Sequence, residues 1–363
     1  MNKIQQLYKE WLALQPLNEK LERNINQQFM VDFNYNSNHL EGNTLTYGQT
    51  KLLLLFGDTI GNASIQDYEE MKAHNVGLEL MKAEAKDSNR MLSEHFIRKL
   101  NQTILVRDFY KTSKDGDYRY KINVGVYKTR PNSVITPTGE IFDYASPEET
   151  TSLMGDLVEW YRNEEQRGKL KVEELAALFH YRYIRIHPFE DGNGRIARLL
   201  VNYILLRNNY PMLVIRSDDR NNYLKALRQC DLLAGKITFD GAHATLQLTK
   251  PLVDYISAVL ENKLTALIQL AKGEISELIE AKGEEKGGQK NVPESGTENG
   301  TENGTENQVI IELMQQMPEI TIDKIVIQTG KSRRTVIRRI QKLKTEGIIE
   351  RIGGDRGGYW KVN

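Results

Sequence analysis

The stretch from Ile186 to Leu200, which reads IHPFEDGNGRIARLL, constrains the fold of this chain more than any other. Two glycines flank an asparagine within it, so the backbone there can adopt turns that other residues resist. Apolar residues then recur at helical spacing, at positions 196, 199, 200, 203 and 204. The Gly-Asn-Gly run therefore predicts the start of a helix, where free N–H groups and the helix dipole favour an anion.

Charged and titratable side chains surround this predicted helix start. Arg195 and Arg198 are three residues apart and share one helix face, an arrangement that suits a polyphosphate. Asp191 precedes the turn, where a carboxylate suits Mg²⁺ or a helix N-cap. His187 is the nearby side chain whose ordinary pKa suits a general base. A turn histidine and a solvated Arg face are ordinary structural explanations, but the combination indicates nucleotidyl or phosphoryl transfer.

The order His-Pro-Phe-x-Asp/Glu-Gly-Asn-Gly-Arg-x-x-Arg is the motif of Fic proteins, and this chain resembles that family from His187 to Arg198. The resemblance implies transfer of AMP from ATP to a Ser, Thr or Tyr hydroxyl of a target protein, the chain itself included. His187 is then expected to take the hydroxyl proton, and Asp191 to hold Mg²⁺. The resemblance places the phosphates on Gly192, Asn193 and Gly194, with contacts from Arg195 and with Arg198 on the γ-phosphate.

The resemblance leaves the transferred group and the target open. Fic relatives differ in what they move, so UMP, phosphate, phosphocholine and the removal of AMP from a modified protein stay as alternatives. The target protein is not identified by the sequence, and a homodimer is left open.

A second short motif, Ser37-x-x-x-Glu41-Gly42, lies near the N-terminus. Ser37 suits a helix N-cap and Gly42 a helix end, so the residues alone predict a capped turn between two helices. The motif is also similar to the inhibitory motif of Fic proteins. In those relatives the Glu pairs with the second Arg of the main motif, here Arg198, and blocks the position of the γ-phosphate.

A predicted helix start near residue 220 carries Asn222 and Tyr223. Fic relatives have a Tyr at the corresponding place that lines the adenine pocket. Tyr223 is therefore a candidate for stacking on the base, with Asn222 beside it. A core Tyr packed under the motif helix is the equal alternative.

The chain is expected to be mainly α, with a Fic-type helical domain, a small β-hairpin flap and a C-terminal winged helix-turn-helix. An N-terminal helical region with the inhibitory motif is expected at 1–105, and the Fic core with its flap at 106–281. Positions 125–127 and 133–136 are predicted as short strands of the flap, which in relatives holds the target. Residues 282–307 contain a repeated GTEN sequence and predict a flexible linker.

Residues 308–363 are expected to form the winged helix. Lys and Arg number 11 there against 6 Asp and Glu, and four arginines crowd positions 333–339. DNA binding through phosphate contacts is one interpretation, and a protein-interaction module is the other. The whole chain is then alternatively a DNA-binding regulator whose Fic domain senses a nucleotide.

The totals give no further hint of a partner. Lys and Arg together equal Asp and Glu at 49 each, which indicates neither nucleic acid nor a membrane. The single cysteine, Cys230, excludes an internal disulfide and suits a reducing compartment. No apolar signal segment follows Met1, and the apolar run at 52–56 is too short to span a bilayer, so a cytoplasmic protein is expected.

Overall fold

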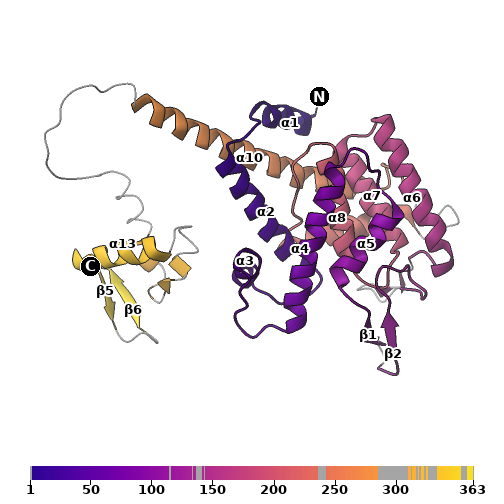
Figure 1. Ribbon diagram of the computed structural model, residues 1–363, viewed down its shortest axis with the longest axis horizontal. Coiled ribbons are helices and arrows are strands. Elements are labelled where there is room, and N and C mark those ends of the chain that lie inside the picture. Colours follow the sequence, from indigo (N-terminus) through magenta and orange to yellow (C-terminus); the bar gives the residue numbers. More distant parts are fainter. Residues whose placement is uncertain are drawn as a thin grey trace. The chain divides into compact units, whose positions relative to one another are not determined.

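The computed structural model describes residues 2–113, 116–132, 134–135, 141–142, 144–235, 243–284 and 333–352, and also 310–311, 313–315, 318, 320–322, 324–325 and 358–362. The chain divides into two units, Met1–Lys286 and Gly287–Asn363, each with its own core. Figure 1 shows the helices and strands of both units.

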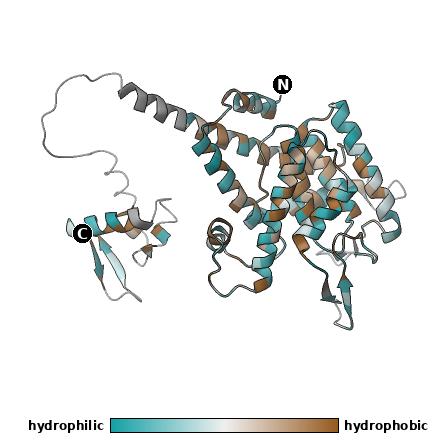
Figure 2. Cartoon of the chain, viewed as in Figure 1, coloured by the Kyte–Doolittle hydropathy of each residue, from teal (hydrophilic) through white to brown (hydrophobic). Residues whose placement is uncertain are grey.

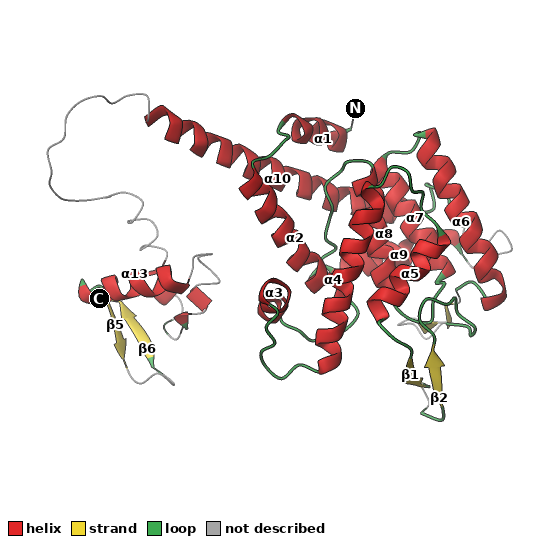
Figure 3. Cartoon of the chain, viewed as in Figure 1, coloured by secondary structure: helices red, strands yellow, loops and turns green. Residues whose placement is uncertain are grey.

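The described part of the first unit is built from ten helices and two short β-ribbons (Figure 3). The helices are α1 (Lys3–Ala13), α2 (Glu19–His39), α3 (Tyr47–Phe56), α4 (Ile65–Lys86), α5 (Glu94–Leu105), α6 (Pro147–Arg167), α7 (Val172–Ile186), α8 (Asn193–Arg207), α9 (Arg220–Ala234) and α10 (Lys250–Glu284). The strands are β1 (Phe109–Thr112), β2 (Arg119–Ile122), β3 (Val134–Ile135) and β4 (Ile141–Phe142), paired as β1–β2 and β3–β4.

Helices α7 and α8 form the centre of this unit, where apolar residues gather (Figure 2). Helix α8 is buried on all sides along most of its length, because its apolar residues are not confined to one stripe. Helices α4 and α5 pack against α8, while α6 and α10 pack against α7. The loop between α7 and α8 runs from His187 to Gly192, and Asn193 and Gly194 begin α8, so the motif lies between two central helices.

The Ser37–Gly42 motif lies at the end of α2, not at the start of a new helix. Asn18 caps α2, which continues through Ser37 to His39, so the expectation that Ser37 is an N-cap is wrong. Gly42, with φ +97, lies in the turn that follows. Ser37 and Glu41 still lie close together because they occupy successive turns of chain.

The flap region differs in part from its expectation. Positions 125–127 form a turn and not a strand, because Gly125 has φ +70 and its N–H bonds to the Asn101 side chain on α5. The ladder β1–β2 instead pairs Phe109 with Ile122, and it projects from the end of the helical bundle (Figure 1). Val134–Ile135 is a strand as expected, whereas residues 133 and 136 lie outside the described residues.

The second unit contains α13 (Arg333–Thr345), β5 (Ile349–Ile352) and β6 (Tyr359–Val362), with helical residues at 310–311, 313–315, 322 and 324–325. The β5–β6 pair and α13 enclose Trp360, whose indole N–H donates to the Ile320 carbonyl at 2.9 Å. This order of helix, strand and strand confirms the predicted fold class. The predicted linker lies outside the described residues from 285 onward.

No helix among the described residues is both long enough and apolar enough to cross a membrane.

Candidate active site

His187 lies at the C-terminal end of α7 in a left-handed conformation, with φ 50 and ψ 59. A residue with a side chain rarely adopts this conformation, and it costs about 1–3 kcal/mol unless the surroundings enforce it. Pro188 follows and cannot continue the helix. The chain therefore leaves α7 abruptly at the imidazole.

The imidazole of His187 is held neutral. Burial of the ring lowers the pKa of His187 to about 4, and the nearby Lys128 charge adds to this effect. Glu41, Asp191 and the Ile184 carbonyl act in the opposite direction but do not reverse it. The ring of Tyr144 stacks on the imidazole, with centroids 4.0 Å apart. Since Nδ1 is buried, Nε2 is the nitrogen through which a neutral His187 accepts a proton.

Asn193 shapes the loop that separates His187 from α8. Its side-chain oxygen accepts from the Phe189 N–H at 3.0 Å, and its amide donates to the Phe189 carbonyl at 2.6 Å. Phe189 is itself buried in the core. The Asn193 side chain therefore fixes the loop, which leaves its backbone to line the helix start. Gly192, at φ +81, is the N-cap of α8.

Arg198 is buried and bound to the Ser37–Gly42 motif. Its Nη2 donates to Glu41 Oε1 at 2.7 Å and to the Ser37 carbonyl at 2.8 Å, and its Nε donates to Ser37 Oγ at 3.0 Å. Burial alone raises the pKa of Glu41, but the charge and hydrogen bond of Arg198 outweigh it, so the pKa lies below its usual value. The Glu41 carboxylate is therefore ionised.

Gly194 is the point on α8 that Glu41 covers. A Cβ at this position would lie 2.2 Å from Glu41 Oε1 and 3.1 Å from Arg198 Nη1, so a larger residue does not fit. The carboxylate thus lies on the first turn of α8, beside its free N–H groups. A helix start with an adjoining Arg is an anion site, and here the anion is the chain's own side chain.

Two cationic side chains of the chain itself, Lys111 and Arg195, neutralise the charge of the Asp191 carboxylate. Its Oδ2 lies 2.5 Å from Lys111 Nζ on β1, and its Oδ1 lies 3.4 Å from Arg195 Nη2 and accepts from the Gly192 N–H. Burial raises the pKa of Asp191, but Lys111 and Arg195 lower it further than burial raises it. An ionised carboxylate beside a phosphate site fits Mg²⁺, which often binds one carboxylate and substrate phosphates.

The two candidates for the adenine pocket, Tyr223 and Asn222, lie in different environments. Tyr223 is buried, and its hydroxyl is hydrogen-bonded to His180 Nε2 at 2.8 Å. Asn222 is exposed and donates to Asp219 Oδ1 at 2.6 Å. This geometry favours the core alternative for Tyr223, behind Arg198, and the adenine-pocket role stays a prediction.

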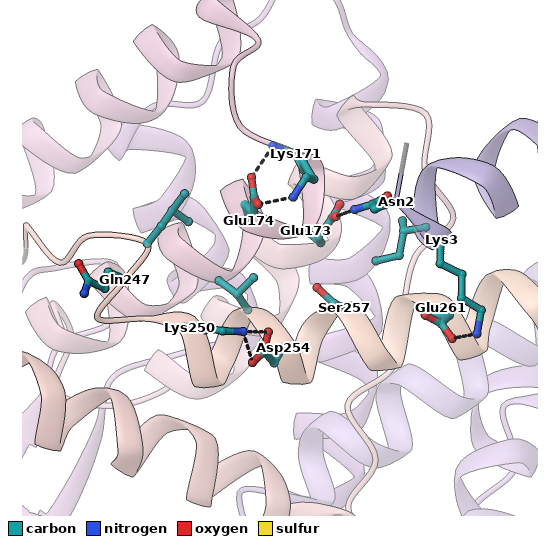
Figure 4. Close-up of a pocket in the computed structure, with 13 residues that line it drawn as sticks. Asn2, Lys3, Lys171, Glu173, Glu174, Gln247, Lys250, Asp254, Ser257 and Glu261 are labelled. Atoms are coloured by element: carbon teal, nitrogen blue, oxygen red, sulfur yellow. Dashed lines mark hydrogen bonds and ion pairs between the residues drawn. The ribbon is translucent and has the colours of Figure 1, made fainter.

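A cavity of about 530 Å³ between the start of α1, the start of α7 and α10 lies away from this motif (Figure 4). Its cationic side chains already have partners, since Lys171 pairs with Glu174 and Lys250 pairs with Asp254. Lys3 pairs with Glu261, so none of the described residues that line this cavity is a free cation that would attract a phosphate.

Comparison with known proteins then decides the family. The Fic/DOC family model matches residues 91–205, and an HTH domain model matches residues 305–360. A Fic domain-containing signaling protein from Bacteroides thetaiotaomicron, of known crystal structure, is 60% identical; the match covers 75% of this chain and 97% of that chain, with a TM-score of 0.70. This chain belongs to the Fic/DOC family.

Other Fic proteins are more distant. Protein adenylyltransferase fic-1 from Caenorhabditis elegans is 28% identical over 257 residues, which are 68% of this chain and 46% of that protein. Protein adenylyltransferase Fic from Nematostella vectensis is 27% identical over 197 residues, which are 54% of this chain and 42% of that protein. The chain thus spans less than half the length of these relatives. A Fic family protein from Desulfovibrio desulfuricans, 18% identical with a TM-score of 0.52, covers all of this chain and shares its fold; the match covers 96% of that protein.

Four residues near the Fic motif were not identified from the sequence. Lys111 contacts Asp191, Lys128 lies near His187, Arg130 Nη2 lies 2.7 Å from Glu190 Oε2 in the motif, and Tyr144 stacks on His187. All of them lie between α5 and α6, in the segment 106–146, which is called the flap region because it contains the predicted flap. Their contacts depend on how that region folds back over the motif, which no local pattern indicates.

The Glu41–Arg198 pair predicts a dependence of stability on pH. Because the pKa of Glu41 is lowered on folding, the pair stabilises the fold fully above the unfolded pKa of about 4.3. That contribution is lost as the pH falls through the folded pKa. We expect the parent chain to unfold at a higher temperature than Glu41→Gln from pH 7 to 5, and the gap to close below about pH 4. The side chain of Glu41 is 38% exposed, so the effect should not exceed about 1 kcal/mol.

Thermal unfolding followed by circular dichroism at stepped pH measures this gap. Glu79→Gln, in an exposed pair with Lys82, is the matched control. A gap between the parent chain and Glu41→Gln that stays constant down to pH 3 would contradict the assignment.

Proposed function

We propose that this chain is a protein adenylyltransferase that moves AMP from ATP to a protein hydroxyl and that is inhibited by its own Glu41. The observation that carries the proposal is the Glu41 carboxylate on Gly194 and Arg198, an anion site built next to a neutral His187. The curated relatives named protein adenylyltransferase support the same reaction.

The chain's residues suit each part of the transfer. The target hydroxyl oxygen attacks the α-phosphorus, the bond to the β-phosphate oxygen breaks, and pyrophosphate leaves. Nε2 of His187 takes the hydroxyl proton. The start of α8 with Arg195 and Arg198 neutralises the phosphate charge that develops, and these groups are positioned before ATP arrives. Mg²⁺ bound at Asp191 would supply further charge neutralisation.

Inhibition follows from competition for one guanidinium. The γ-phosphate and the Glu41 carboxylate both suit the fork of Arg198 and the first turn of α8. A triphosphate can therefore reach its productive position only when Glu41 has moved. The buried, unpaired Cys230 suits a reducing compartment, and we propose that the enzyme acts in the cytoplasm.

Labelling with α-labelled ATP and Mg²⁺ tests the activity and the inhibition. We expect weak self-labelling in the parent chain, strong labelling in Glu41→Gly, and a loss of about 10²–10⁴-fold when His187→Ala is added to Glu41→Gly, because the general base is gone. Glu22→Gly, at the exposed start of α2, is the matched control and should behave as the parent.

Equal labelling of the parent chain and Glu41→Gly would remove the inhibition claim. Labelling that survives His187→Ala would remove the proposed mechanism. The same assay with α-labelled UTP, and release of AMP from a pre-labelled chain, tests the alternative nucleotide and the reverse reaction. A cell lysate added to Glu41→Gly, followed by mass spectrometry, tests for a target other than the chain itself.

The ammonium of Lys111 lies where a divalent cation would bind Asp191, so Lys111 and the metal should compete for this carboxylate. Removing Lys111 in the Glu41→Gly chain should raise the affinity for Mn²⁺ in the presence of a non-hydrolysable ATP analogue by about 3- to 10-fold, the scale of one partly exposed ion pair. Electron paramagnetic resonance of free Mn²⁺ measures this without turnover. Lys121→Ala, which breaks an ion pair with Asp108 in the same hairpin, is the control. An unchanged or weaker affinity in Lys111→Ala would refute the competition.

A second candidate function is DNA binding by the second unit, with the Fic unit as a nucleotide sensor. Helix α13 buries Val336, Ile340 and Leu343 and exposes Arg338 and Lys342. These two exposed cations are four residues apart and share a face, as phosphate contacts on one groove would require. The match to an HTH domain supports this candidate.

Fluorescence anisotropy of the full chain on a mixed-sequence DNA duplex at several salt concentrations tests this second candidate. We expect the logarithm of the affinity to fall linearly with the logarithm of salt. In Arg338→Ala/Lys342→Ala the slope should decrease by about 1–2, because each phosphate contact contributes about 0.9. Lys99→Ala, exposed on α5, should leave it unchanged. No binding at 50 mM salt, or an unchanged slope in the double variant, would favour the protein-interaction alternative.

A further inference from the structure

The turn that carries His187 is held by a segment of the flap region, residues 128–132. The carbonyls of four consecutive residues, 186 to 189, each accept a hydrogen bond from this segment. Lys128 provides two of the donors: its Nζ donates to the Ile186 carbonyl at 2.9 Å, and its backbone N–H donates to the Pro188 carbonyl at 2.8 Å.

Asn132 provides the other two donors. Its side-chain amide donates to the carbonyls of His187 at 3.2 Å and Phe189 at 3.0 Å. Its side-chain oxygen accepts from Lys128 Nζ at 2.8 Å. The two side chains therefore form one connected unit, and it satisfies every carbonyl of the turn on both sides of the imidazole.

The position of Lys128 is costly, which argues against a passive role. Its side chain is buried, and burial lowers the pKa of Lys128 to about 8. The charge of Glu149 partly opposes this shift, but no ion pair of Lys128 occurs among the described residues. A buried ammonium without a carboxylate disfavours folding, so a hydrophobic residue would suit stability better. Lys128 instead provides hydrogen-bond donors to the strained turn and a positive charge near His187.

We propose that Lys128 and Asn132 are positioning residues for the transfer reaction: they fix the left-handed turn at His187, and the Lys128 ammonium adds to the effect of burial in keeping the imidazole in its neutral, proton-accepting form. The charged groups that face His187 come from three segments: Lys128 from the flap region, Glu41 from the turn after α2, and Asp191 from the motif loop. Lys128 opposes protonation, whereas the two carboxylates favour it. The catalytic part of this inference rests on the proposed function, but the ionisation state of His187 does not.

Two substitutions separate positioning from simple scaffolding. Asn132→Asp keeps the shape and the acceptor for Lys128, but it replaces the amide that donates to two carbonyls with an oxygen that cannot donate. Lys128→Met removes the charge and the donor at similar length, and Lys128→Arg keeps both. Asn89→Asp and Lys99→Met, at exposed positions, are the matched controls.

The first measurement is the titration of His187 by NMR in the full chain with labelled histidine, from pH 7.5 to 4.5. His187 should stay neutral over this range in the parent chain, in Lys128→Arg and in the controls. In Lys128→Met the pKa of His187 should be higher than in the parent chain, because burial alone then opposes protonation. This readout needs no turnover, so it stands even if the chain transfers a group other than AMP or none.

The second measurement is labelling from α-labelled ATP in the Glu41→Gly background. Lys128→Met and Asn132→Asp should lower kcat by about 10- to 100-fold, the scale of a misplaced catalytic group, with the KM for ATP unchanged. Lys128→Arg should restore most of the loss. If Lys128→Met fails to fold, the kcat of Asn132→Asp decides whether the hydrogen bonds to the turn position His187.

The proposal is overturned if both variants match their surface controls in kcat and in the His187 titration, or if they change only the KM for ATP. Absence of labelling in Glu41→Gly itself would instead overturn the proposed function. In that case the NMR titration still decides whether Lys128 controls the imidazole.

Discussion

The contact between Glu41 and Arg198 across Gly194 is the interaction on which the rest of the site depends. It joins the end of α2 to the first turn of α8, and the close approach requires glycine at position 194. The rest of the buried face of α2 is unusually polar, because Asn34 bonds to His74 on α4 at 2.6 Å and Asn36 bonds to Ser217 at 2.8 Å. Such bonds are directional and costly to leave unmade inside a protein. These bonds hold the C-terminal part of α2 in place beside α4 and the segment before α9.

The other charged side chains of the motif also form ion pairs within the chain. Lys111 neutralises Asp191, Arg130 neutralises Glu190, and Glu41 neutralises Arg198, so the chain's own side chains balance the site. Under the proposed function, a metal–nucleotide complex would replace two of these partners, Glu41 at Arg198 and Lys111 at Asp191. The flap region supplies both cations and also holds the His187 turn. The segment expected to meet a target protein is thus tied directly to the residues expected to do the chemistry.

Local patterns revealed the parts of the site that lie within one segment. The Gly-Asn-Gly run and the helical spacing behind it predicted the start of α8. The resemblance of the Ser37–Gly42 motif to that of Fic relatives predicted the pairing of Glu41 with Arg198, but not the bonds from Arg198 to Ser37. The N-cap assigned to Ser37 was wrong because Asn18 starts a helix that continues past it. Lys111, Lys128 and Asn132 could not have been found in this way. Their roles arise from a hairpin register and a turn at Gly125 that bring distant segments together.

The central claim is that the start of α8 holds a triphosphate once Glu41 is removed. The most direct test is a crystal structure of the Glu41→Gly chain with Mg²⁺ and a non-hydrolysable ATP analogue. We expect the γ-phosphate on Arg198, the metal on Asp191, and the α-phosphate facing Nε2 of His187. A triphosphate bound elsewhere, with the Gly192–Gly194 turn empty and the imidazole directed away from the nucleotide, would contradict the account.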